Sequence, residues 1–223
     1  MQDNTKRGLR TLFWMKAVLV TAALAIAFFV GGNIDSIAQD LQAISPGIIF
    51  FVIAFFGSAL LMGLSAGLEG LFFMLWIFRM TENLRVVTKT KFSPWGAIVC
   101  MCIPYVGGIL LYFILKNLIQ RQEEYLTSND VNFVPANMKF LNAMLAVILV
   151  SSAVSLAAPS SASWLLIVTD IILAFAYMVC LIKLVMSVTA QEKILFDFYN
   201  NQEFRRKVNE MLRERDMVST EKV

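Results

Sequence analysis

Five long apolar runs alternate with short polar segments along the chain. An α-helix needs about 20 apolar residues to cross a bilayer, so this pattern predicts an all-α integral membrane protein. We expect a polytopic membrane domain over residues 1–188 and a cytosolic, basic, amphipathic tail over residues 189–223. The apolar runs cover residues 12–30, 48–78, 95–119, 140–158 and 164–188.

The positive charges favour a topology in which one run does not cross. All 19 Lys and Arg residues fall before or at the start of the first run, within 79–91, within 116–139, or from Lys183 onward. If residues 95–119 enter the membrane and return, every one of these charges lies on the cytosolic side, as the positive-inside rule prefers. We therefore predict four transmembrane helices plus one re-entrant or broken hairpin, with both ends of the chain cytosolic at the bacterial inner membrane. The alternative, in which this run crosses, remains open.

Three polar or mixed segments are predicted to be amphipathic helices at the membrane surface. Residues 31–47 carry no Lys or Arg and fit the outer face, whereas the basic linker 79–91 fits anionic lipid at the cytosolic face. In the tail, Asn200 and Glu203 have capping-box spacing and predict a new helix start. That helix has one apolar face and many basic residues, so it either lies on the inner leaflet or docks a partner helix.

Composition agrees with a membrane protein and excludes several functions. Hydrophobic residues make up 58% of the chain, and the net charge of +3 is too small to indicate nucleic-acid binding. The chain has no histidine, so the G-x-S-x-G match at 63–67 lacks the base that a serine nucleophile needs. Its three cysteines lie in apolar runs and are interpreted as packing residues. We expect no catalytic residue, no metal ligand and no cofactor.

The second and fifth runs contain the candidate functional positions. Ala59, Gly63 and Gly67 recur every four residues, which predicts a face where another helix can approach closely. Glu69 and Asp170 are carboxylates at membrane depth, where ionisable groups usually face a partner or water. For Glu69 a second interpretation remains open, in which the helix has already reached the hydrated interface.

One stretch, residues 76–104, has a recognisable signature. It contains Trp76, Arg79 and Asn83 in the pattern W-x-x-R-x-x-x-N, then a basic linker, then S-P-x-x-A and I-P. This signature resembles a bacterial membrane family known as domain of unknown function 4328, which has no assigned chemistry. The resemblance implies structural anchors, with Asn83 bonding loop backbone and Arg79 binding phosphate or pairing with Glu69, while a role of these residues in binding a ligand remains open. Gly107 stands where the family has an asparagine. The later motif positions are Ser93, Pro94 and Pro104.

Three classes of function follow from these features. The first is a non-enzymatic membrane protein that acts by association, as a scaffold or accessory subunit, in a homo-oligomer or with another membrane protein. The second is a small transporter or channel component that uses Glu69 and Asp170. The third is an intramembrane enzyme, for which the chain has no histidine base and no phosphate loop. The association class has the most support in the sequence.

Overall fold

The computed structural model describes residues 1–31, 46–103, 106–157 and 164–220. All regular structure in these ranges is α-helical, which confirms the predicted all-α class. The surface helix predicted at 31–47 lies almost entirely outside the described residues, and so does Pro104. The helices are α1 (Thr5–Gly31), α3 (Pro46–Val87), α4 (Pro94–Met101), α5 (Gly107–Ser128), α6 (Met138–Ala157) and α7 (Trp164–Thr220).

Three helical stretches are long and apolar enough to cross a membrane. They are Thr5–Ile26, Phe56–Val87 and Val168–Arg213, and α6 contributes the shorter apolar stretch Met138–Val154. Large apolar side chains point outward from them, as at Phe56 and Leu60, which are each 66% exposed. Such a surface is stable in lipid and unfavourable in water. The chain is therefore a membrane protein.

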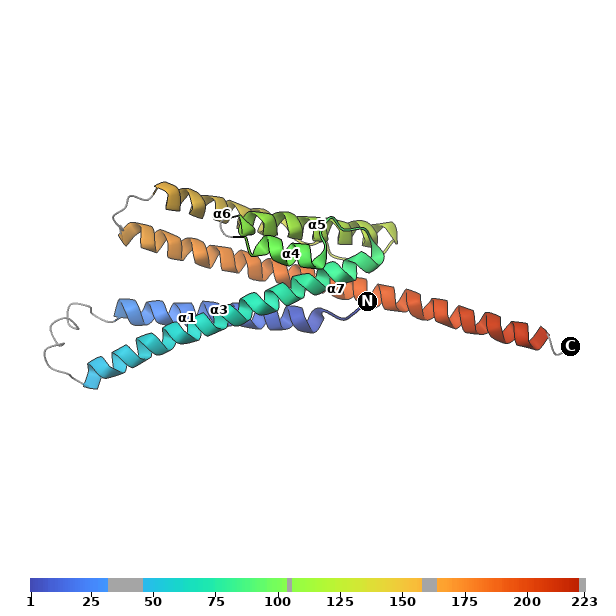
Figure 1. Ribbon diagram of the computed structural model, residues 1–223, viewed down its shortest axis with the longest axis horizontal. Coiled ribbons are helices and arrows are strands. Elements are labelled where there is room, and N and C mark those ends of the chain that lie inside the picture. Colours follow the sequence, from blue (N-terminus) through green and yellow to red (C-terminus); the bar gives the residue numbers. More distant parts are fainter. Residues whose placement is uncertain (32–45, 104–105, 158–163, 221–223) are drawn as a thin grey trace.

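The helices form two antiparallel pairs that meet at one end of the molecule. Figure 1 shows α1 beside α3 and α6 beside α7, with the pairs spread apart at one end and close together at the other. At the closed end, α4 and α5 lie against the pairs, and the buried core gathers there. Its largest fully buried side chains come from 76–84 of α3 and 114–126 of α5, together with Met15 of α1 and Leu141 and Met144 of α6. Residues 181–188 of α7 add further buried apolar side chains.

Two helices continue well past the ends that the charge pattern predicted. α3 has 42 residues and passes through Arg79 to Val87, and α7 has 57 residues and passes through Asn200 without a break. The predicted new helix start at Asn200 is therefore wrong. Neither 71–93 nor 164–220 contains Gly or Pro, so no residue in these stretches interrupts a helix.

The third apolar run is divided into two helices that pack against each other, α4 and α5. α4 begins at the S-P-x-x-A motif, where Ser93 is the N-cap and Pro94 lies in the first turn. The Ser93 hydroxyl accepts a hydrogen bond from Gly96 N at 2.9 Å, and Ala97 is fully buried. At the start of α5, a Cβ on Gly107 would lie 2.4 Å from the Met101 carbonyl oxygen. The helices approach so closely that only glycine fits at this position.

Replacing Ser93 with alanine is expected to loosen α4. The change removes the side-chain acceptor of Gly96 N, and loss of an N-cap typically costs about 1 kcal/mol. Hydrogen exchange followed by mass spectrometry should therefore show faster exchange in the first turn of α4. The control is Ser128→Ala, which removes an exposed hydroxyl at the end of α5. Equal exchange in the Ser93 variant and the native protein would contradict the capping role.

Candidate functional site

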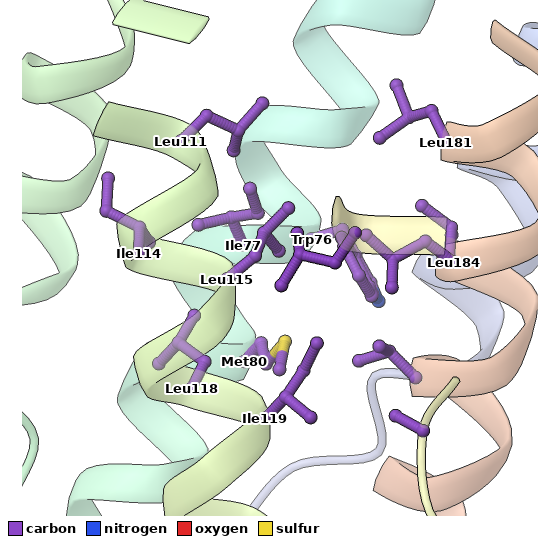
Figure 2. Packing of buried hydrophobic residues seen from close by; sticks show 14 of the residues in the cluster. Trp76, Ile77, Met80, Leu111, Ile114, Leu115, Leu118, Ile119, Leu181 and Leu184 are labelled. Atoms are coloured by element: carbon purple, nitrogen blue, oxygen red, sulfur yellow. The ribbon is translucent and has the colours of Figure 1, made fainter. Parts of the chain in front are cut away.

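The motif residues Trp76 and Asn83 lie on one face of α3. They are seven residues apart, which is about two helical turns. Trp76 is fully buried, stacks on Phe73 with ring centroids 5.8 Å apart, and lies among core side chains of α5 and α7, including Leu115 and Leu184 (Figure 2). Asn83 is only 3% exposed. This face of α3 therefore points at the centre of the closed end.

The segment before α1 is bound by the same face of α3. Asn83 makes two hydrogen bonds to the backbone of Gln2, accepting from its N at 3.0 Å and donating to its O at 2.8 Å. Asp3 accepts a hydrogen bond from Thr5 N at 2.9 Å, and hydrogen bonds from Thr5 hold the pKa of the Asp3 carboxyl below its ordinary value. As the resemblance implied, Asn83 bonds backbone, and that backbone belongs to residues 1–4.

These elements converge on Glu192 of α7. Asn4 Nδ2 donates to both carboxylate oxygens of Glu192, at 3.0 and 3.1 Å, and to the Trp76 carbonyl oxygen at 3.1 Å. Asn83 Nδ2 lies 3.3 Å from Glu192 Oε1. We call Asn4, Asn83 and Glu192 the polar junction. It ties the N-terminal segment, α3 and α7 together through side chains that are 2–3% exposed.

The polar junction holds a carboxylate without a basic partner. No Lys or Arg in the described ranges forms an ion pair with Glu192, and its hydrogen bonds come from neutral amides. Asn4 Oδ1 and Trp76 Nε1 are buried nearby and have no hydrogen-bond partner among the described residues. Buried polar atoms of this kind are commonly satisfied by internal water. The arrangement is suited to holding helices in register.

The amide orientation of Asn4 follows from its surroundings. Its nitrogen faces three acceptors, which are the Trp76 carbonyl and the two Glu192 oxygens. The reversed amide would place an oxygen against those acceptors and lose every one of these hydrogen bonds. Asn4 is therefore the donor that compensates the buried carboxylate.

The two predicted membrane carboxylates are placed apart from this junction. Glu69 is half-buried on α3 and lies near enough to Tyr177 of α7 to interact with it electrostatically. Asp170 is exposed and lies seven residues before Tyr177, which is about 10 Å along α7. Because Glu69 lies near Tyr177, Asp170 is about 10 Å along α7 from the neighbour of Glu69. Among the described residues no hydrogen bond or ion pair joins Glu69 and Asp170.

The small-residue face of α3 is open. A Cβ added to Gly63 or Gly67 would meet nothing within 4 Å among the described residues, and Ala59 is half-buried. The contact with α1 uses a different face of α3, where the Ser65 hydroxyl lies 3.2 Å from the Thr21 hydroxyl. Packing among the described residues therefore leaves Gly63 and Gly67 without a neighbouring helix.

Arg79 has a local ion-pair partner, and the three cysteines form no disulfide. Arg79 pairs with Glu82, one turn further along α3, in place of the predicted Glu69. Cys100, Cys102 and Cys180 are free thiols. Within the described ranges, no group of three or more His, Cys, Asp or Glu residues is arranged to bind a metal.

The sequence pattern identified Trp76 and Asn83 but not Glu192, to which Asn83 bonds. The available signal was the position of Glu192 on α7, where it follows Val185 and Val188 and precedes Leu195 on a buried helical face. A charged residue at such a position marks a buried polar contact. Asn4 could not be recognised in the same way, because it lies among other polar residues before the first apolar run. No family model, curated protein or solved structure matches this chain, so the interpretation of the site rests on its own geometry.

Proposed function

We propose that this protein is a non-enzymatic integral membrane protein that acts by association, as a scaffold or accessory subunit. The observation that carries this proposal is the C-terminal part of α7. Residues 200–220, which we call the arm, extend away from the helix pairs (Figure 1). Phe204 and Met211 on the arm are 67% and 60% exposed. An apolar face on a projecting helix suits a partner helix that covers it.

The arm is stabilised as a helix by its own side chains. Lys207 and Glu203 pair at 3.2 Å, and Arg206 and Glu210 pair at 3.5 Å, each four residues apart. Such pairs favour a helix that has few tertiary contacts. A helix that is formed before binding loses less conformational entropy when a partner arrives. The partner class that fits is a second copy of this chain or another membrane protein.

The proposed topology has four crossings, by α1, α3, α6 and α7, with α4 and α5 as a re-entrant hairpin. The distribution of all 19 basic residues supports it, because this topology leaves each of them on the cytosolic side. The close contact at Gly107 also supports it, since a tight hairpin shields the loosened backbone from lipid. The arm then lies in the cytosol of a cell whose inner membrane holds the protein.

Cysteine labelling tests this topology. In a chain whose three native cysteines have been replaced, single cysteines at Thr127 and Gln202 should both resist an impermeant thiol reagent applied from outside. Both positions are exposed, so permeabilised cells should label them and serve as the control. Labelling of the Thr127 site in intact cells would mean that the third run crosses.

The mass of the complex in a mild detergent tests association through the arm. The native chain should migrate as a homo-oligomer or with a stoichiometric membrane protein, and Phe204→Glu should reduce that mass to one chain. Arg213→Gln is the control, because this exposed charged residue lies on the opposite side of the helix from Phe204 and Met211. A single-chain mass for the native protein, or an unchanged complex in the Phe204 variant, would refute the proposal.

A further inference from the structure

An apolar groove runs along the crossing of α3 and α4. It has a volume of about 290 Å³ and only apolar side chains line it. Phe78 and Trp95 form its wall, with ring centroids 5.3 Å apart and nearly perpendicular planes. Trp95 is 71% exposed although it is large and apolar. We call this the α3–α4 groove, and its lining residues are Leu71, Met74, Leu75, Phe78, Trp95 and Ile98.

A second cavity of about 460 Å³ continues the groove toward the charged end of α3. Phe78 and Trp95 line both spaces, so the two form one surface. The second cavity also contains polar groups, namely Glu82 and Arg85 of α3 and the first turn of α4 at Pro94. The combined surface is thus wholly apolar at one end and charged at the other.

The charged end favours an anion. Arg79 already pairs with Glu82, while Arg85 forms no ion pair with any described residue. The N-terminus of α4 opens on the same cavity, and its helix dipole adds partial positive charge. The guanidinium can bind a phosphate directly, whereas the α4 N-terminus contributes its partial charge, since Pro94 has no N–H and Gly96 N is already bound by Ser93.

The surface changes from apolar to charged along α3, as a phospholipid changes from acyl chain to headgroup. From Leu71 to Val86 the surface follows α3 for about 22 Å. Its apolar end lies beside the part of α3 that is apolar enough to cross a membrane, and its charged end lies where that stretch terminates. Exposed tryptophan is typical of the membrane interface between these two regions.

We propose that the α3–α4 groove and the cavity at Arg85 form a binding site for one anionic phospholipid. An acyl chain lies in the groove against Phe78 and Trp95, and the phosphate lies at Arg85 and the first turn of α4. This site is separate from the arm, and it does not depend on the proposed association. A partner helix would fit the apolar end, but the unpaired Arg85 and the change of polarity along the surface favour a lipid.

Native mass spectrometry of the full chain tests the site. The protein in neutral detergent is titrated with phosphatidylglycerol or with phosphatidylcholine of identical acyl chains, and bound lipid is counted by mass. One phosphatidylglycerol should bind more tightly than phosphatidylcholine. Arg85→Gln should weaken phosphatidylglycerol about fivefold, the effect of one basic residue at an anionic headgroup, and should weaken phosphatidylcholine less, because its choline cation offsets the charge of the phosphate. Arg205→Gln on the arm is the charge control.

Filling the groove tests its apolar end. Leu75→Trp places a larger ring in the groove and should abolish binding of both lipids, whereas Leu64→Trp, at an exposed position of α3 outside it, should not. Ile98→Trp gives the same test from α4 if the first variant does not fold. Equal binding of the two lipids, unchanged binding in the groove variants, or a bound protein segment in place of lipid would each overturn the proposal.

Discussion

Asn4→Ala is expected to lower the free energy of unfolding by about 3 kcal/mol, because it removes the main hydrogen-bond donor of a buried carboxylate. Asn4 contacts both oxygens of Glu192, and the remaining amide donor, Asn83, is 3.3 Å away. The alanine variant leaves the carboxyl group buried with too few donors. Reversible unfolding in mixed micelles, followed by circular dichroism, measures the loss.

A second substitution separates this explanation from a simple loss of packing. Glu192→Leu removes the buried carboxyl group, so the double variant Asn4→Ala with Glu192→Leu should be more stable than Asn4→Ala alone. Replacing both partners of a buried hydrogen bond with apolar groups is often close to neutral. Asn142→Ala is the matched control, since it removes an exposed asparagine with one hydrogen bond to Tyr112. If the loss of unfolding free energy in the double variant equals the sum of the losses in Asn4→Ala and Glu192→Leu, the polar junction does not act as a unit.

Gly8→Ala is expected to destabilise the contact of α1 with α7 by about 2 kcal/mol, the usual range for an overpacked site. A Cβ at Gly8 would lie 2.5 Å from Thr189 Oγ1 and 2.7 Å from Thr189 Cγ2. Thr189 is β-branched and buried in a helix, so it has few rotamers into which it can move. The helices must separate, and a lower midpoint of thermal unfolding should report it.

Thr189→Ala should rescue the Gly8 variant. It removes both of the nearest atoms and leaves only Thr189 Cβ, at 3.2 Å from the new methyl group. Gly70→Ala is the matched control, since nothing lies within 4 Å of its added Cβ among the described residues and alanine favours the helix. A Gly8 variant as stable as the native chain would show that α1 and α7 are not in tight contact.

The all-helical class and most helix starts were predictable because they depend on local signals. The apolar runs predicted most of the helices, and the run at 95–119 begins one residue after the start of α4 at Pro94. Helix ends were less predictable, as α3 and α7 show. Charged residues such as Arg79 mark the edge of the hydrocarbon, but they are good helix formers and do not end a helix.

The polar junction was only half predictable. Trp76 and Asn83 stood out through their spacing, yet the role of Asn83 in the junction depends on Glu192, which is 109 residues beyond it. Such a pairing depends on how the helices pack, and no local pattern records it. The same reason explains why Arg79 pairs with nearby Glu82, which a local rule of three-residue spacing would favour over Glu69.

The unbroken course of α7 gives the molecule a mechanical property. From Glu192 to Thr220 the helix is about 42 Å long, and it contains no hinge residue. A rotation of about 5° at the polar junction would therefore displace the tip of the arm by about 4 Å. A small change in helix packing at the polar junction therefore becomes a displacement of several ångströms at the end of α7.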